Sequence, residues 1–276
     1  MRNLLISATI IGIILVISYL YNRNQIKEFK VRDISLSSDK IINTIRLTQV
    51  SDFHSNDSIN INILRSKIQN FNPHLIVLTG DIIDRHDNDL NTVLELMENL
   101  STLNIDIYFI KGNHESDSKL YEQLKFIMEK SGVKILEDDV SSVEIEGNSV
   151  NIIGLEYYDD KNIQIYKNIY KYITKSSYLD VFNLILVHSP NKIREIVCGR
   201  EDLILSGHTH GGQIRIPLIG SLIAPGQGLL PELDKGLYQI DNSIIYIDSG
   251  LGNSFLPIRV FNSVQFTNIT IKGELD

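Results

Sequence analysis

The sequence predicts an α/β fold, a four-layer αββα sandwich of two mixed β-sheets flanked by helices and preceded by an N-terminal transmembrane helix. Three observations indicate this fold. In the first half of the 276-residue chain short apolar runs alternate with segments of helical periodicity, the second half is richer in strands, and residues 4–20 carry no charge. Strands that alternate with crossover-length connections favour a mainly parallel sheet covered by helices.

The uncharged run at residues 4–20 has the composition of a membrane-spanning segment. At a rise of about 1.5 Å per residue it nearly crosses the roughly 30 Å hydrocarbon core, and Tyr19 and Tyr21 are suited to the interface. We therefore expect residues 1–23 to form a single-pass anchor in the cell membrane, and residues 24–38 to form a polar tether. A cleaved signal peptide and a buried core helix are the alternatives. Basic residues on both flanks leave the orientation open.

Residues 39–276 are expected to form one domain, because no internal repeat, low-complexity segment or linker interrupts them. The first half of this domain consists of strand-helix units whose strands are brief and rich in branched residues. Apolar residues recur at helical spacing from Ile61 to Phe71, and Pro73 stops that helix. The expected strands are 45–49, 75–79, 105–110 and 133–136, and two further helices are expected near 90–97 and 119–128.

The second half of the domain supplies the second sheet. Gly147-Asn148 favours a tight hairpin turn between two strands, and a polar helical stretch is expected around residues 163–172. The expected strands are 143–146, 150–154, 182–187, 203–205, 213–217, 237–240, 244–247 and 264–271. Ligand sites in α/β sheets lie at the carboxyl ends of strands, so polar residues just after the strands are candidate site residues.

Five short polar stretches each come directly after one of the expected strands. They are Asp52-Phe53-His54, Gly80 to Asp84, Gly112 to Glu115, His188, and Gly207 to His210. Five of the seven histidines fall in these stretches. A core histidine satisfied by one hydrogen bond explains a single case, but not five with one placement. His74 lies outside the pattern and is interpreted as structural, whereas His86 is near enough to the site to be a substrate contact.

The donors in these stretches are carboxylate, amide and imidazole groups, without a thiolate. That set favours manganese, iron or zinc, with manganese preferred, over a structural zinc cage. Two divalent metal ions are expected, because the donors exceed the roughly four to six ligands that one ion takes. Asp81 is the natural bridging carboxylate.

The balance of charge limits the partners. The net charge is -8 and the pI about 5.4, so no global basic field holds nucleic acid. An anionic substrate must be attracted locally, and bound cations would do that. The single cysteine excludes an internal disulfide.

The five stretches, in this order and over about residues 45–212, resemble the calcineurin-like metallophosphoesterase superfamily. The pattern of that superfamily is Asp-x-His, Gly-Asp-x-x-Asp, Gly-Asn-His-Glu, a separate His, and Gly-His-x-His. The resemblance implies a hydrolase of phosphoester bonds in which His114 faces the substrate and Asp84 orients it. It also implies two metal-binding groups. The first is Asp52, His54, Asp81 and His210, and the second is Asp81, Asn113, His188 and His208.

Residues 207–217 and 249–259 are similar to a narrower, membrane-anchored subgroup, some of whose members are linked to hydrolysis of a UDP-diacylglucosamine lipid precursor. Together with the expected membrane anchor, this similarity favours a phosphodiester or pyrophosphate substrate that is lipid-linked or a cell-envelope precursor, although the sequence does not separate monoester, diester and pyrophosphate substrates. Arg215 and Arg259 are candidates for binding its phosphate, because Arg binds phosphate bidentately. Ordinary ion pairs would explain either arginine equally well.

Other functions stay open on the sequence alone. A broad phosphomonoesterase or nucleotide phosphodiesterase would use the same site. A non-catalytic metal-binding module tethered to the membrane would have no need for His114 and Asp84. A metal-dependent nuclease would normally add a basic groove, which the charge balance disfavours. The sequence does not decide the oligomeric state.

Overall fold

Two six-stranded mixed sheets form the centre of the structure, a computed structural model that describes residues 2–158, 164, 167–168, 171, 180–253 and 257–273. In the first sheet β2 to β5 are parallel, whereas β16 is antiparallel to β2 and parallel to β1. In spatial order its strands are β1 (Lys30–Ser38), β16 (Gln265–Gly273), β2 (Ile45–Val50), β3 (Leu75–Leu78), β4 (Asp106–Phe109) and β5 (Val133–Ile135).

The second sheet has a parallel centre and an antiparallel strand at each edge. In spatial order its strands are β14 (Gly236–Ile240), β15 (Ser243–Ile247), β9 (Leu203–Ser206), β8 (Phe182–Val187), β7 (Asn148–Leu155) and β6 (Asp139–Ile145). The prediction of an α/β fold with two mixed sheets is thus confirmed.

Alternating side chains of the central strands divide the core into layers. In β3, Ile76 and Leu78 pack among the helices of the first sheet, whereas Leu75 and Val77 point between the two sheets. This is the period of two that a strand buried on both faces requires. The helices against the first sheet are α2 (Ile61–Phe71), α3 (Asn91–Ser101) and α5 (Tyr121–Lys130), and α7 (Ile193–Ile196) packs on the outer face of the second sheet.

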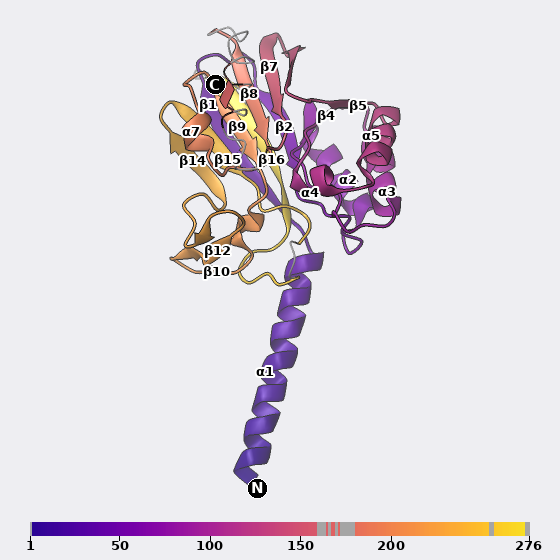
Figure 1. The fold of residues 1–276 in the computed structure, drawn as a ribbon, viewed down its shortest axis with the longest axis vertical. Coiled ribbons are helices and arrows are strands. Elements are labelled where there is room, and N and C mark those ends of the chain that lie inside the picture. The colour runs from indigo at the N-terminus through magenta and orange to yellow at the C-terminus, as the bar shows by residue number, and fades with distance from the viewer. Residues whose placement is uncertain are drawn as a thin grey trace.

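Short elements occupy the connections near the strand ends. After β4 comes α4 (Asn113–Asp117), and after β9 comes the 3-10 turn η2 (His210–Gly212). Two small hairpins follow η2 and lie near the body end of the long helix α1 (Figure 1). They consist of β10 (Arg215–Ile216) with β11 (Gly220–Ser221), and β12 (Ile223–Ala224) with β13 (Gly228–Leu229).

Two local expectations differ from the structure, and a third falls on residues that are largely not described. Residues 30–38, expected to belong to a polar tether, form β1, because Val31 packs with the helix side of the first sheet and Ile34 and Leu36 pack between the sheets. The hairpin turn between β6 and β7 is Glu146-Gly147, both at positive φ, one residue earlier than expected. The helical stretch expected at 163–172 lies largely outside the described residues.

The N-terminal helix α1 (Arg2–Lys27) projects from the sandwich as a single rod (Figure 1). Within the described part of the chain, no helix combines the length and apolar character needed to cross a membrane. The predicted transmembrane helix is therefore wrong, and with it the single-pass anchor at residues 4–20 and the localisation to the cell membrane. The uncharged run spans only about 25 Å at 1.5 Å per residue, less than the roughly 30 Å hydrocarbon core.

The polar end of α1 is attached to the body. Gln25 is buried, its backbone carbonyl accepts from Val264 N at 2.9 Å, and its side-chain Oε1 accepts from Ser263 Oγ at 2.8 Å. α1 thus ends as part of the domain, beside the segment that leads into β16.

Candidate metal centre

The loops that leave β2, β3, β4, β8 and β9 converge at one place, so both sheets contribute to the site. Each loop begins where a parallel strand ends, which is where such folds place ligands. The structure brings together all seven side chains that the sequence singles out as donors. They are Asp52, His54, Asp81, Asn113, His188, His208 and His210.

Five of these residues adopt a left-handed backbone conformation. The φ angles are 47° at Asp52, 46° at His54, 53° at Asp81, 68° at His208 and 50° at His210. This conformation is strained for a residue with a Cβ, and such residues cluster at functional sites. The backbone is therefore strained at these five residues, where it directs their side chains toward the site.

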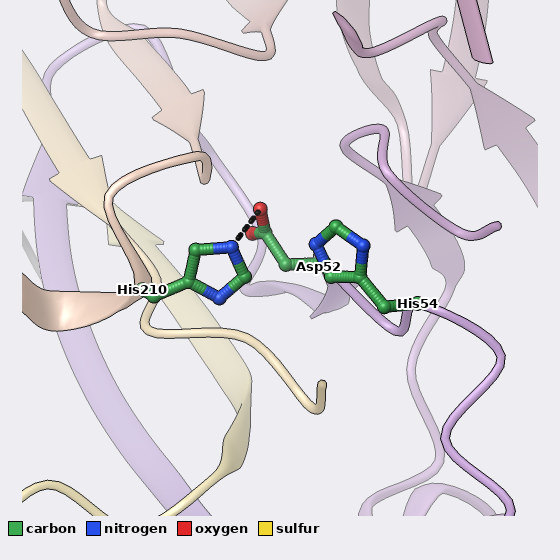
Figure 2. A group of neighbouring side chains, drawn as sticks. All are labelled: Asp52, His54 and His210. Carbon is green, nitrogen blue, oxygen red and sulfur yellow. Dashed lines mark ion pairs between the residues drawn. The ribbon is translucent and has the colours of Figure 1, made fainter. Parts of the chain in front are cut away.

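The first group of donors is Asp52, His54 and His210, whose donor atoms lie within 4.8 Å of one another. Figure 2 shows the ion pair between His210 Nε2 and Asp52 Oδ1, which are 3.8 Å apart, with His54 on the other side of Asp52. All three side chains are buried. Both ring nitrogens of His54 are buried without a hydrogen-bond partner. A native structure seldom leaves such atoms unsatisfied, so they need a ligand that the protein alone does not supply.

The second group is Asp81, His188 and His208. His188 Nε2 lies 3.1 Å from Asp81 Oδ2, and Asn113 Oδ1 lies 3.0 Å from His188 Nε2 and 2.8 Å from His208 Nδ1. Asp81 Oδ2 is also 3.7 Å from His54 Nε2. Asp81 therefore lies between the two groups.

The electrostatics of this cluster favour a cation. Burial opposes the charge of Asp81, but the rings of His188 and His54 hold the pKa of its carboxyl well below the usual range. Burial would lower the pKa of His188, yet Asp81 outweighs it and raises that pKa to about 9. The Asp81 carboxylate is thus stabilised by a positive charge beside it. With the oxygen and nitrogen donors and the unsatisfied His54, this arrangement fits divalent metal ions.

Outer contacts fix the orientation of the donors. His188 Nδ1 lies 2.8 Å from the carbonyl of Thr79, to which it donates, so Nε2 is the ring nitrogen that faces the site. His208 N donates to both carboxylate oxygens of Asp52, at 2.9 and 3.1 Å. Gly112 lies so close to Asp81 that a Cβ there would be 2.3 Å from Asp81 Oδ1. A glycine is needed at that position.

Glu115 is a fully buried carboxylate that holds two of the converging loops together. Its Oε2 accepts from Asp81 N at 2.8 Å and from Gly112 N at 2.9 Å. Its Oε1 accepts from Ile82 N at 2.7 Å and from Ile83 N at 3.1 Å. Glu115 lies in one of the five polar stretches, but its role is not evident from the sequence, because nothing there shows that four backbone N–H groups meet it.

We expect Glu115→Gln to lower the free energy of unfolding by about 2 to 6 kcal/mol, because the amide NH₂ would face two buried N–H donors, each costing roughly 1 to 3 kcal/mol. Chemical denaturation measures this change. Glu129→Gln, an exposed position on α5, is the matched control and should stay within about 0.5 kcal/mol of the parent. An unchanged Glu115→Gln would contradict the proposed role of this carboxylate.

His114 and Asp84 lie beside the donor groups. His114 Nδ1 is 3.2 Å from Asp84 Oδ2 and 3.1 Å from Arg85 N, and the His114 ring stands edge-on to His54 with centroids 4.4 Å apart. Asp84 is itself held, since its Oδ1 accepts from His86 N at 2.8 Å. Burial lowers the pKa of His114 to about 4. The ring is thus neutral at physiological pH and fixed through its Nδ1 side.

The three candidate substrate residues occupy different surroundings. His86 is exposed on the loop after β3. Arg215 is paired through Nη1 with Asp234 Oδ2 at 2.8 Å and with the Gly211 carbonyl at 3.0 Å. Arg259 is fully buried, and its guanidinium donates to backbone carbonyls.

Tyr157 is a neighbour of the site that the sequence analysis missed. Its ring centroid is 6.1 Å from that of His188 and 6.2 Å from that of His208. It comes shortly after β7, so the rule that located the other loops would have pointed to it. Tyr157 was not among the predicted site residues, because only Asp, Gly and His residues at strand ends were considered.

Comparison with known proteins bears directly on this geometry. Residues 45–212, more than half of the chain, match the calcineurin-like phosphoesterase family. The chain belongs to that family. As a member it is a metal-dependent hydrolase of phosphoester bonds, and the predicted family and enzyme class are confirmed. The narrower membrane-anchored subgroup and its UDP-diacylglucosamine substrate are not.

Relatives of this phosphoesterase cover most of its length. The uncharacterized metallophosphoesterase YkoQ of Bacillus subtilis is 29% identical over 269 residues, which cover 93% of this chain and 96% of that protein. The uncharacterized metallophosphoesterase YkuE of the same organism is 29% identical over 234 residues, 83% of this chain and 79% of the relative. The crystal structure of TT1561 of Thermus thermophilus has a TM-score of 0.52 at 10% identity, with 76% of this chain and 91% of that chain covered. The last similarity concerns the fold alone.

Proposed function

We propose that this phosphoesterase is a dinuclear metal-dependent hydrolase of phosphodiester or pyrophosphate bonds, and that its substrate is a lipid-linked or cell-envelope precursor. One observation carries the dinuclear part of the proposal. Two groups of buried donors come within reach of a single carboxylate, Asp81, which is 3.1 Å from His188 Nε2 and 3.7 Å from His54 Nε2. A carboxylate between two donor groups is the arrangement that a bridging ligand needs.

The donor groups divide into two ligand sets. Asp52, His54, Asp81 and His210 would hold one cation, and Asp81, Asn113, His188 and His208 the other, with manganese as the first metal to test. When bound, two such cations neutralise phosphoryl charge and supply a water of lowered pKa as nucleophile. They also supply the local positive charge that this acidic chain needs to attract an anionic substrate.

His114 and Asp84 carry the chemistry of the leaving group in this proposal. The Asp84 carboxylate and the Arg85 backbone N–H hold the Nδ1 side of His114. Because Nδ1 accepts from Arg85 N, the neutral ring carries its proton on Nε2, which is then available to stabilise the transition state by a hydrogen bond to the departing oxygen, or to give that oxygen a proton after the ring itself has been protonated. These roles explain why a catalytic site keeps the pair, whereas a metal-binding module would not need it.

Exposed apolar side chains on the part of the chain that follows His210 support a substrate with an apolar portion. They lie on and around the hairpins that follow η2, the element that carries His210. Leu218 is 108% exposed, Leu229 80%, Leu230 66% and Ile219 64%. Clusters of exposed apolar residues mark interaction sites on protein surfaces.

Metal-reconstituted protein incubated with three substrates tests the function. The panel is a chromogenic phosphomonoester, a chromogenic phosphodiester and a UDP-linked lipid, each also incubated with His114→Ala protein. The proposal expects hydrolysis of the UDP-linked lipid at the highest kcat/KM. Faster turnover of the monoester would make the protein a broad phosphomonoesterase instead. No turnover of any member by protein that carries two metals would overturn the enzymatic proposal.

The double variant Leu218→Asn and Leu229→Asn tests the apolar surface. We expect it to raise KM for the UDP-linked lipid by about 10-fold or more, since burying one leucine contributes roughly 1.5 to 3 kcal/mol. KM for the chromogenic phosphodiester, which has no acyl chain, should not change. An equal change in KM for both substrates, or an unchanged KM for the UDP-linked lipid, would show that the hairpins do not bind the apolar portion of the substrate.

A further inference from the structure

Arg259 is a buried cation whose partners are backbone carbonyl groups. It is 0% exposed, and among the described residues no carboxylate lies within ion-pair distance of it. Its Nη2 donates to the carbonyls of Ser249, at 2.7 Å, and Gly252, at 2.6 Å, and its Nε donates to Asn253 Oδ1 at 3.2 Å. Burying a guanidinium is costly, so what it contacts indicates why it is there.

The Ser249–Gly252 turn that Arg259 holds is pressed against the first donor group. Leu251 N donates to the Ser51 carbonyl at 3.0 Å, and Gly252 N donates to the Asp52 carbonyl at 2.5 Å. Gly250 has a φ of 73°, and a Cβ on it would lie 2.5 Å from the Cβ of Asp52. The turn therefore sets the position of Asp52 by direct contact.

Arg259 also reaches the other side of the first donor group. Its Nη2 is 3.4 Å from His210 Nδ1, and Asn262 Nδ2, three residues later, donates to the His210 carbonyl at 2.7 Å. The Nε2 of His210 is the nitrogen that faces Asp52 Oδ1, at 3.8 Å. Residue Asn262 thus holds His210 through its backbone carbonyl, and the Arg259 guanidinium lies beside the His210 ring. The other side of that ring, with Nε2, faces Asp52 (Figure 2).

The helix α1 fixes this segment from outside. Arg259 N donates to Asn22 Oδ1 at 2.8 Å, and Asn22 Nδ2 donates to the Pro257 carbonyl at 2.9 Å. Phe261 N donates to the Tyr21 hydroxyl at 3.0 Å. A continuous chain of contacts runs from α1 through Arg259 to His210 and Asp52.

We propose that Arg259 is a positioning residue that holds His210 and the Ser249–Gly252 turn against Asp52, and that Asn22 of α1 sets its place. This inference rests on the proposed dinuclear function, because it assigns Arg259 to one of the two ligand sets. It gives α1 a role in the catalytic domain. It also predicts that damage at Arg259 or Asn22 weakens one metal position and leaves the other intact.

Titration with Mn²⁺, followed by metal counting and electron paramagnetic resonance, tests the proposal on full-length protein. Wild type should bind two ions with a spin-coupled signal. Arg259→Met removes the donors at similar length, and we expect it to weaken one of the two ions by about 10- to 100-fold, the usual cost of losing an outer-shell contact. The affinity of Arg259→Lys protein for that ion should lie between those of Arg259→Met and wild type, because lysine keeps the charge but lacks the forked guanidinium group.

Asn22→Ala keeps the proposal testable where Arg259→Met fails to fold, because Asn22 is only half-buried. It should weaken the same ion by a smaller factor and lower kcat with little change in KM. Arg65→Met is the matched control. Arg65 lies on α2, contacts Thr102 Oγ1 at 2.8 Å far from the donor groups, and should behave as wild type.

The outcomes separate the two proposals. Wild-type protein that binds fewer than two ions would overturn the dinuclear function. Wild-type protein that binds two ions, together with Arg259→Met and Asn22→Ala proteins that bind both at wild-type affinity and keep wild-type kcat, would overturn the positioning role alone. Loss of thermal stability in Asn22→Ala with unchanged ion affinity would also overturn it, since Asn22 would then be merely structural.

Discussion

Asp81→Ala should lose both metal ions and lower kcat/KM by at least about 10³-fold. Among the described residues, Asp81 is the carboxylate within contact distance of both donor groups, through His188 Nε2 at 3.1 Å and His54 Nε2 at 3.7 Å. Loss of a metal ion removes several kcal/mol of transition-state stabilisation, and each 1.36 kcal/mol is tenfold in rate. Metal analysis after dialysis, together with hydrolysis of the chromogenic phosphodiester, measures both effects.

Asp57→Ala is a suitable control for this prediction. Asp57 is exposed on the loop after β2, so its removal changes the charge of the chain by the same amount without touching a donor group. Asp81→Ala also removes the acceptor of the His114 N–H, which donates to Asp81 Oδ1 at 2.8 Å. Circular dichroism of the variant must therefore match wild type before its metal content is interpreted. Two ions retained by a folded Asp81→Ala protein would mean that Asp81 does not bridge.

The donor residues were predictable because one physical rule places them. A buried parallel strand has a short apolar run that is easy to recognise, and the residue after it lies at the sheet edge where ligands bind. Asp52, Asp81, Asn113, His188 and His208 all obey this rule, although they come from two different sheets. The order of the five motifs then identified the family, which the match over residues 45–212 confirms.

What the sequence did not reveal depends on contacts between distant segments. From the sequence Arg259 is a candidate for binding phosphate or for an ordinary ion pair, because nothing local shows that residues 249–253 fold around its side chain. Likewise β1 pairs with β16, more than two hundred residues away. Polar residues lie between the apolar residues of β1, so its sequence was interpreted as a tether. Asn22 joins Pro257 and Arg259 in the same way.

The apolar run at the N-terminus shows that amino-acid composition alone does not decide what a helix packs against. Residues 4–20 are uncharged, and composition alone does not distinguish a membrane span from a helix that ends by docking on its own domain. The contacts of Tyr21, Asn22 and Gln25 with residues 257–264 show that the C-terminal end of this helix docks on its own domain. They belong to the part of α1 that was expected to lie at the edge of an anchor.

The geometry around His114 separates metal binding from catalysis. Its backbone N–H contacts Asp81, whereas its ring contacts Asp84 and Arg85. Removing the ring leaves the backbone contact in place, and the seven proposed metal donors are untouched. The variant His114→Ala should therefore retain two ions.

His114→Ala should nevertheless lower kcat by about 10² to 10⁴-fold, the usual contribution of a positioned hydrogen-bond donor or general acid at the departing oxygen. The loss should be largest for a substrate with a poor leaving group and small for a chromogenic ester whose leaving group departs without a proton. Asp84→Asn, which keeps the shape but weakens the hold on Nδ1, should lie between wild type and His114→Ala. Single-turnover rates on both kinds of ester, with metal content measured in the same samples, give the result. Equal losses for good and poor leaving groups would point to transition-state charge stabilisation instead of proton donation, and full activity would remove His114 from the mechanism.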